Sequence, residues 1–305
     1  AYMINRGHVV SENQVNDDIS GVACDFCHTI TGFVGNTPAD GKYISSPGDI
    51  KYGPTLSASN KHHSKYSPLF RGSEFCAICH NSTNHNGIEV KSTFTEWKES
   101  IYAKKNIQCQ DCHMNAKGYL TDGKPVYESG SAAYINIVGY GMVTRQREKL
   151  FTHRFPGAHH KTQLDAAISL NIEIERLGDN EINVNVLVDN SVTGHKMPTG
   201  STELRLLWLE VKARAGDMII PLTAISENEP AFDVTGKSPF DKEIIRDDIP
   251  DGVRIYRTVF IDKNGKQTMS SYMASKIVFD NRLKSAEIRK ETYRLKIPEG
   301  VKGKL

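Results

Sequence analysis

The amino-acid sequence predicts a fold in two parts: an irregular N-terminal region with a few short helices, and a C-terminal antiparallel domain that is β-sandwich-like. Residues up to about 162 are rich in Gly, Ser, Asn and Lys and show little apolar periodicity. Residues from about 170 onward alternate apolar and polar side chains between short turns, which is typical of strands with one buried face. We therefore expect one domain at residues 1–165 and a β-rich domain at residues 166–305.

Length and composition narrow the classes of protein to consider. The 305 residues have room for about two domains, and 38% of them are hydrophobic, as in a globular protein. No run of about 18 apolar residues occurs, so we expect no transmembrane segment. Lys and Arg (38) nearly balance Asp and Glu (36) without a basic cluster, so we expect no nucleic-acid partner.

The N-terminal region contains three C-x-x-C-H motifs, which together use every cysteine of the chain. They are formed by Cys24, Cys27 and His28, by Cys76, Cys79 and His80, and by Cys109, Cys112 and His113. C-x-x-C alone also fits a zinc half-site, a redox dithiol or a disulfide. Six thiolates do not divide into whole four-cysteine zinc sites, however, and neither of the other two uses requires the His.

Covalent haem c explains all the defined positions of the motif. Both sulfurs bond to vinyl groups of the porphyrin, and the His binds the iron as the proximal ligand. We therefore expect three covalently attached haems c. Each porphyrin is a large flat apolar body, so a haem-packed region can fold although its sequence is irregular. The motifs follow one another closely, so we expect the haems to lie near one another.

The expected haem c also indicates the cellular compartment of the protein. Because this cofactor is attached outside the cytoplasm, we expect an exported protein, either periplasmic or extracellular at the cell surface. Residues 1–20 are polar and lack an apolar signal core, so any signal peptide has already been removed.

The sequence of the N-terminal region predicts few helices or strands. Residues 35–60 are loop by composition. Residues 92–105 predict a short helix that leads into the third motif, with Ser92 or Thr93 as its cap. Residues 155–167 would join the two domains.

The sequence of the C-terminal region predicts β-hairpins. Residues 170–177 and 181–190 alternate apolar and polar side chains around Gly178, Asp179 and Asn180. The other expected elements are a hairpin in residues 203–222 that turns at 215–217, one in residues 252–266 that turns at Asn264 and Gly265, and a last strand in residues 286–298.

The second axial ligand decides what each haem can do. A haem with a fixed ligand on both faces carries electrons, whereas an open face can bind and transform a small molecule. Eight histidines remain besides the three proximal ones, enough for bis-histidine ligation throughout. The candidate distal ligands are His8, His62, His63, His153 and His159.

These candidates differ in their setting. His62 and His63 lie before the second motif, and Pro156-Gly157 would form a turn that lets His153 and His159 point at separate irons. His160 is a weaker alternative in the same segment. His85 follows its own motif too closely to cross the ring, and His195 is interpreted as a structural loop histidine.

On these residues the chain resembles the multihaem c-type cytochromes of bacteria and archaea. The resemblance rests on the phrases GVACDFCHTITG, HHSKYSPLFRGSEFCAICHN, EWKESIYAKKNIQCQDCHM, HRFPGAHH and GHKMPTGSTELRLLWLEV, scattered between residues 21 and 211. It implies a closely packed bis-histidine haem array beside a β-rich C-terminal region, acting in periplasmic or cell-surface electron transfer. Some relatives polymerise into extracellular filaments in which the haems continue across subunit contacts.

Three departures from the family's pattern stand out. Related proteins often have a histidine ligand where this chain has Tyr102, so that ligand is missing or replaced. Filament-forming relatives often carry four or more haems, whereas this chain has three motifs. No C-x-x-C-K occurs, so the lysine-ligated catalytic haem of the pentahaem nitrite reductases is absent.

The favoured hypothesis is an electron carrier that is not itself an enzyme. Its partners would be redox proteins or neighbouring copies of the chain, because His8 could ligate a haem of the next subunit and an exposed strand edge could join chains. The first alternative is a multihaem oxidoreductase with one open haem that acts on a small nitrogen or sulfur oxyanion, with Tyr102 as the residue to test. The second is a binding module whose β-rich half docks a partner.

Overall fold

The computed structural model describes residues 3–5, 8–10, 22–56, 59, 61–139, 141–158, 160–227, 229–237 and 249–297. These residues form two compact units, each described by itself below. We call the first the motif unit: the described residues up to His80 together with Asn106–Gln163. We call the second the β unit: Asn81–Lys105 together with the described residues from Leu164 onward.

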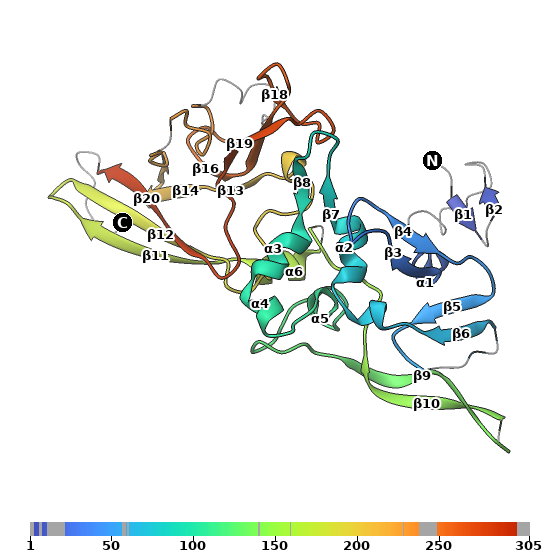
Figure 1. Ribbon diagram of the computed structural model, residues 1–305. Helices are drawn as coiled ribbons and strands as arrows, with labels where there is room; N and C mark the ends of the chain where they lie inside the picture. Colours follow the sequence, from blue (N-terminus) through green and yellow to red (C-terminus); the bar gives the residue numbers. More distant parts are fainter. Residues whose placement is uncertain are drawn as a thin grey trace. The chain divides into compact units, whose positions relative to one another are not determined.

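The motif unit consists of short helices, small strand pairs and one long hairpin (Figure 1). Its helices are α1 (Cys24–His28), η3 (Pro68–Arg71), α2 (Glu74–His80) and α5 (Cys109–His113). Its antiparallel pairs are β1 (Met3–Asn5) with β2 (His8–Val10), β3 (Ile30–Phe33) with β4 (Tyr43–Ser45), and β9 (Glu128–Ile137) with β10 (Gly141–Leu150). Its parallel pair is β5 (Ile50–Gly53) with β6 (His63–Tyr66).

Two expectations for this unit are wrong in detail. Residues 35–60, expected to be loop, contain β4 and β5, which pair with segments outside that range. The ten-residue strands β9 and β10 were not expected at all. Their sequences mix Gly, Ser, Ala and charged residues, so the hairpin lacks the apolar alternation by which strands are predicted.

The β unit contains most of the strands. Its first part holds β7 (Asn81–Thr83), β8 (Glu89–Ser92), α3 (Thr93–Glu99) and α4 (Ile101–Lys104). Helix α6 (Lys161–Ala167) spans the point where the chain passes from the motif unit into the β unit. The elements after it are β11 (Ser169–Arg176), β12 (Glu181–Asp189), η4 (Thr202–Leu204), β13 (Leu207–Leu209), β14 (Val211–Ala215), β15 (Met218–Leu222), β16 (Arg254–Tyr256), β17 (Thr258–Ile261), β18 (Gln267–Thr268), β19 (Lys276–Asp280) and β20 (Ile288–Lys296).

The hairpins expected in this unit are confirmed. Strand β11 pairs antiparallel with β12, which also pairs with β20; β14 pairs with β15, and β17 with β18 and β19. The β17–β18 turn uses Gly265 at φ 78°, a conformation that glycine adopts without strain. Residues 203–206 are the exception, since they lie in η4 and a loop rather than in a strand. The sandwich-like arrangement of these sheets stays a prediction.

The helix expected at residues 92–105 is interrupted. Ser100 is extended (ψ 165°) and ends α3, and its hydroxyl accepts the N–H groups of Tyr102 and Ala103, which begins α4. Ser92 does not cap α3 through its side chain; its hydroxyl donates to Glu96 at 2.7 Å. A serine inside a helical pattern can therefore act as a cap and divide the helix.

The core of the β unit lies on one face of the β11–β12–β20 sheet. The alternating side chains Ile182, Val184, Val186 and Val188 of β12 are all buried, as the period of two along a strand requires. They cluster with Leu209, Leu222, Ala224, Val234, Tyr256, Leu283, Tyr293 and Leu295. The Tyr293 hydroxyl donates to the Leu209 carbonyl at 3.1 Å, so its polar end is satisfied.

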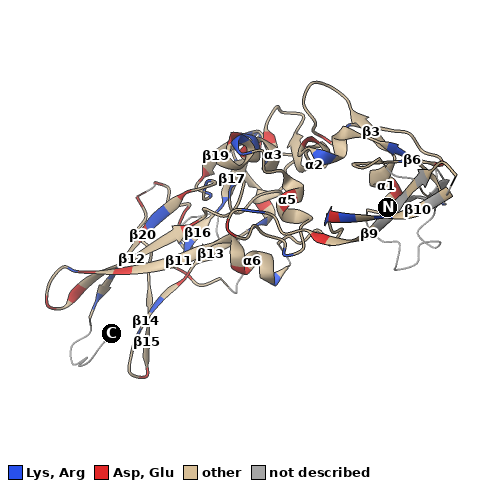
Figure 2. Cartoon of the chain, turned by 90° about the horizontal axis from the view of Figure 1, so that it is seen from below, with Lys and Arg blue, Asp and Glu red and all other residues tan. Residues whose placement is uncertain are grey.

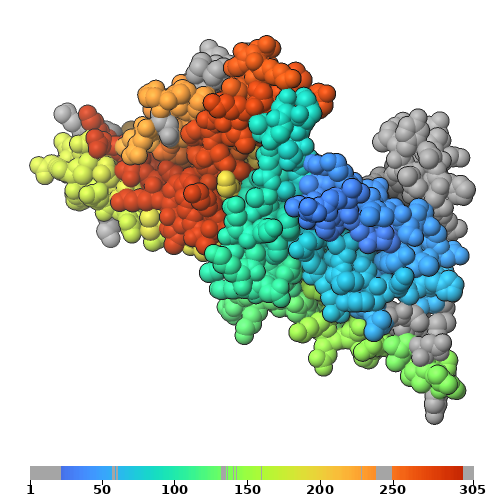
Figure 3. Space-filling model, in the orientation of Figure 1, coloured from blue at the N-terminus to red at the C-terminus, as the bar shows by residue number. Residues whose placement is uncertain are grey.

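Residues 81–105 pack with the C-terminal part of the chain although the third motif follows them directly in sequence. Figure 3 shows these residues, in cyan and green, against the orange and red residues of the same unit. A buried ion pair joins the two segments: Arg282 Nη1 lies 2.7 Å from Glu96 Oε1. The domain boundary expected after residue 165 stays a prediction, and no sequence pattern indicated this packing.

Charge is distributed without a single dominant sign. Figure 2 shows acidic and basic residues interspersed along the described chain. No helix among the described ranges has the length and apolarity needed to cross a membrane.

Candidate functional site

Each C-x-x-C-H motif forms one short helix of the motif unit. Helices α1 and α5 begin at the first cysteine of their motifs, and all three helices end at the histidine. Residues three apart lie on one face of a helix, so both sulfurs of a motif can reach one flat group. None of the six cysteines forms a disulfide. The donor set therefore fits thioether attachment of three haems.

The first motif is held by strand β5. His28 Nδ1 lies 2.6 Å from the Tyr52 carbonyl oxygen, and Lys51 Nζ lies 3.2 Å from Asp25 Oδ1. A carbonyl only accepts, so Nδ1 carries the proton and Nε2 keeps a free lone pair for a metal. Such a hydrogen bond orients a ligating imidazole and raises its basicity. Phe70 stacks on the same ring, with centroids 5.4 Å apart.

The third motif repeats this arrangement with another partner. His113 Nδ1 lies 2.8 Å from the Pro156 carbonyl oxygen and 3.2 Å from Gln163 Nε2, and these contacts orient the ring. Gly118 makes the close approach possible, because a Cβ at this position would lie 2.8 Å from Pro156 Cγ. Gly118 also has φ 82°, which strains any other residue. Gln163 Nε2 donates to the Gly118 carbonyl at 2.8 Å and stabilises the turn.

The second and third motifs are tied together where their helices begin. Gln108 Oε1 accepts from both the backbone N–H and the hydroxyl of Ser73, each at 2.9 Å. The Ser73 hydroxyl accepts the Cys109 N–H at 3.0 Å, and Gln110 Nε2 donates to the Gly72 carbonyl at 2.8 Å. These bonds fix α5 relative to the segment that starts α2, so the two attachment sites are neighbours.

The surroundings of the cysteines differ: burial favours the neutral thiol at Cys27 and Cys112, whereas a hydrogen bond with Cys76 lowers the pKa of Cys109. Burial raises the pKa of Cys112 to about 12, with smaller contributions from Asp111 and Cys109. Burial also raises the pKa of Cys27. A zinc site needs both thiols of a pair as thiolates, and burial opposes this at Cys27 and Cys112. Among the described residues no group of three or more His, Cys, Asp or Glu side chains is arranged to hold a metal ion.

Of the candidate distal ligands, His153 lies beside a motif. Its ring centroid is 6.2 Å from that of His28, with the planes at 39°. His153 is exposed, and partial desolvation together with the neighbouring His28 lowers its pKa. The preceding residue, Thr152, is buried and donates its N–H to the Met114 carbonyl at 2.6 Å, so the start of this segment is fixed.

The other candidates are placed as follows. His62 and His63 are exposed; His63 begins β6, and His62 Nδ1 lies 3.1 Å from the His63 carbonyl oxygen. The hydrogen bonds of His62 thus go to its neighbours in sequence rather than to a motif. His8 begins β2, and its side chain lies outside the described residues, as does all of His159. His80 is exposed at the end of α2.

Two histidines treated as weaker alternatives have their own contacts in the β unit. His85 stacks on Tyr272 with ring centroids 4.5 Å apart. His195 Nδ1 lies 2.9 Å from the Lys196 carbonyl oxygen. Tyr102, the residue named for a catalytic alternative, donates its hydroxyl to the Ser191 carbonyl.

Sequence reasoning missed the residues that orient the proximal histidines. The Tyr52 and Pro156 carbonyls act through the backbone, so no side-chain pattern marks them. Ser73, Gln108 and Gln110 are ordinary polar residues close to the motifs, and only their mutual placement makes them a cluster.

The fold resembles that of one solved multihaem c-type cytochrome. A penta-heme cytochrome c552 from Thermochromatium tepidum has a similar structure, with a TM-score of 0.60 and 20% sequence identity. The similarity covers 92% of this chain but only 66% of that cytochrome's chain. At this identity the likeness establishes the fold alone. No protein-family model matches the sequence, and no curated protein matches it either.

Proposed function

We propose that this protein is an exported trihaem c-type cytochrome that carries electrons through closely spaced haems, each with two histidine ligands. The observation that carries the proposal is the lack of an apolar core in the motif unit. Among its described residues the buried apolar side chains, prolines aside, are Ile30, Ala77 and Ile78 alone. So small a core does not offset the entropy of ordering this much chain, and three porphyrins would supply the missing apolar surface.

The motif unit's own residues do three things in this function. The six cysteines anchor the haems, and His28, His80 and His113 provide the proximal ligands. The carbonyls of Tyr52 and Pro156 orient two of these imidazoles and raise their basicity, which lowers the reduction potential of the iron they bind. The Ser73–Gln108 cluster keeps the second and third attachment sites adjacent, which favours electron transfer between them. When bound, haem supplies a one-electron couple between ferric and ferrous iron.

The location and partners follow from the cofactor. Attachment of haem c outside the cytoplasm supports a periplasmic or cell-surface location, with redox proteins or further copies of the chain as partners. Strand β11 supports assembly into a filament: it is an edge of its sheet, and Leu170, Ile172 and Ile174 on it are 58–60% exposed. A long exposed edge with apolar side chains is a ready template for pairing with another chain.

Two measurements on the purified protein test this function. A pyridine haemochrome assay with a mass spectrum should give three haems c per chain; a count of zero would overturn the proposal. Low-temperature EPR of the oxidised protein should show low-spin iron only. One high-spin haem that responds to nitrite, sulfite or hydroxylamine would instead establish the alternative, an oxidoreductase with an open haem. Negative-stain images of the same sample distinguish a filament from separate subunits.

A further inference from the structure

The geometry points to His153 as the second axial ligand of the haem that the first motif carries, opposite His28. This inference rests on the proposed function and deepens it, since it pairs one distal histidine with one motif. The observation behind it is the spacing of two imidazole rings. The His28 and His153 centroids are 6.2 Å apart and their planes are tilted by 39°.

That spacing matches two imidazoles that share one metal. Metal–imidazole bonds in proteins are about 2 Å long, so two imidazole nitrogens on opposite sides of one metal place the ring centroids about 6 Å apart. Stacked rings lie closer in this protein, at 4.4 Å for Phe70–Phe75 and 5.4 Å for His28–Phe70. The His28–His153 pair therefore leaves room for an iron.

The His28 ring is held by a hydrogen bond, whereas the exposed His153 ring is positioned by the residues next to it in sequence. The Nδ1 of His28 is engaged by the Tyr52 carbonyl, which directs Nε2 away from β5. On the other side, His153 follows buried Thr152, which is bonded to Met114 just after the third motif. Phe155 packs edge-on against the His153 ring, with centroids 5.9 Å apart. A ligand position held on rigid neighbours is what an axial site requires.

The short segment from Thr152 to Pro156 then serves two haems. His153 would bind the iron of the first motif, while the Pro156 carbonyl accepts from the proximal His113 of the third motif at 2.8 Å. A shift of this segment would change the ligation of one haem and the hydrogen bond to the other. The first and third haems are thus expected to respond together to changes here.

The first test replaces His153 by glycine in the haem-loaded full chain. We expect EPR to show one of the three haems turning high-spin, and the ferrous protein to bind one CO per chain. Added imidazole should restore the low-spin spectrum by occupying the opened position. The matched control is His85→Gly, which removes a histidine stacked on Tyr272 in the β unit and should leave all haems low-spin. If His153→Gly leaves every haem low-spin, the inference is wrong.

The second test assigns the iron. The double variant Cys24→Ser/Cys27→Ser should lower the haem count from three to two, and adding His153→Gly to it should create no new high-spin haem. A new high-spin haem in this background would mean that His153 serves another motif. If the double variant does not accumulate, NMR of the unaltered protein decides: His28 and His153 ring protons should both show dipolar contacts to one haem, and contacts to different haems would overturn the pairing.

These outcomes are separable from failure of the proposed function. A haem count of three with only low-spin iron in the unaltered protein supports the electron carrier, whatever His153 does. The variant His153→Met adds a graded readout, because a Met/His pair raises the reduction potential relative to two histidines. We expect one of three potentials to rise while the other two move little. An unchanged set of potentials would count against His153 as a ligand.

Discussion

The two units of this protein stabilise themselves in different ways. In the β unit, four alternating residues of β12 are buried and pack with Leu283, Tyr293 and Leu295 in a continuous apolar cluster. In the motif unit, the described residues other than proline bury only Ile30, Ala77 and Ile78 among apolar side chains. Its regular elements are instead connected by polar contacts, such as those of Ser73 and Gln108.

This difference is the one expected if, as proposed, haem supplies the apolar surface that the sequence of the motif unit lacks. Apolar burial contributes about 25 cal/mol per Å² removed from water, whether the surface belongs to a side chain or to a porphyrin. The β unit carries its apolar surface in its own sequence, so its strands alternate visibly. The motif unit carries attachment points instead, so its sequence appears irregular except at the motifs.

Preventing the proposed haem attachment should have the largest effect, because only the motif unit would lose its source of apolar surface. In a variant with all six cysteines changed to serine, we expect the motif unit to lose its ordered structure while the β unit keeps its fold. Hydrogen exchange followed by mass spectrometry should show fast exchange in residues 106–158 and continued protection in β12 and β20. Protection of both units without haem would mean that the motif unit has a sufficient core of its own.

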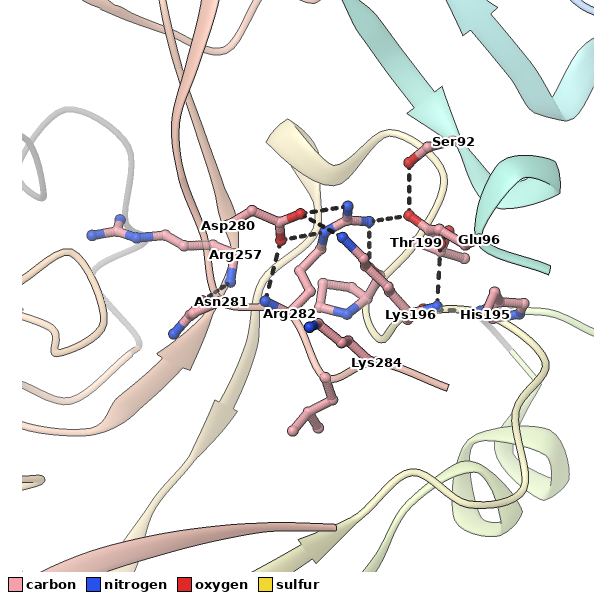
Figure 4. A network of polar contacts seen from close by, with 12 residues as sticks. Ser92, Glu96, His195, Lys196, Thr199, Arg257, Asp280, Asn281, Arg282 and Lys284 are labelled. Atoms are coloured by element: carbon pink, nitrogen blue, oxygen red, sulfur yellow. Dashed lines mark hydrogen bonds and ion pairs between the residues drawn. The ribbon is translucent and has the colours of Figure 1, made fainter. Parts of the chain in front are cut away.

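The buried ion pair of the β unit gives the next largest effect. Figure 4 shows Arg282 between Glu96 and Asp280, and the Arg282 and Glu96 side chains are each about 5% exposed. Arg282→Met would leave Glu96 charged and buried without its partner, which costs about 3 to 5 kcal/mol. Denaturant unfolding followed by far-UV circular dichroism measures this loss.

The control for this change is Arg294→Met. Arg294 also pairs with a glutamate, but its Nε lies 3.7 Å from Glu181 and its side chain is 55% exposed. Exposed pairs contribute at most about 1 kcal/mol, so this variant should be nearly neutral. The haem absorption should stay unchanged in both variants. Equal losses in the two variants would contradict the assignment of Arg282 as the bond between residues 81–105 and the rest of the β unit.

A smaller effect should depend on pH. Burial alone would raise the pKa of Asp280, but hydrogen bonds and charges from Arg282 and Lys196 outweigh it and lower the pKa from 3.8 to about 2. A carboxylate with a depressed pKa stabilises the fold fully above its unfolded pKa and loses that contribution as the pH falls through the folded value. After allowance for solvent screening, the contribution is about 1 to 2 kcal/mol.

The measurement compares the unaltered protein with Asp280→Asn between pH 6 and pH 2. The free-energy difference between them should be constant above about pH 5 and shrink toward pH 2. A difference that does not change over this range would show that Asp280 is not held as a carboxylate by Arg282 and Lys196. The charge-neutral variant is nearly the same size, so packing changes little.

The smallest expected effect concerns one turn of the β unit. Gly265 has φ 78° and no atom lies within 4 Å of the place that a Cβ would take, so Gly265→Ala meets no clash and only strains the backbone. The cost should be about 1 kcal/mol. Gly178, in the β11–β12 turn, also has open space but an ordinary φ, and Gly178→Ala should be neutral or slightly stabilising. Thermal unfolding of the two variants tests this contrast, and equal effects would contradict it.

Particular residues show which structural features could be predicted from the sequence. The alternation in residues 170–177 and 181–190 predicted the β11–β12 hairpin because one strand face must be buried, and this pattern is local. The C-x-x-C-H motifs predicted the attachment sites because their chemistry is also local. Ser100, by contrast, was not expected to divide a helix, and the β9–β10 hairpin was not expected at all, because neither depends on apolar alternation.

Sequence reasoning alone was enough to find that three motifs use every cysteine, that strands build the C-terminal part, and that eight further histidines are available. The tertiary structure was needed to show that residues 81–105 belong to the β unit and that His153 lies beside His28. The reason is the distance along the sequence over which each feature is set. Strand alternation and motif spacing are set by neighbours within a few residues, whereas a contact such as His28–His153 depends on how the intervening chain folds back.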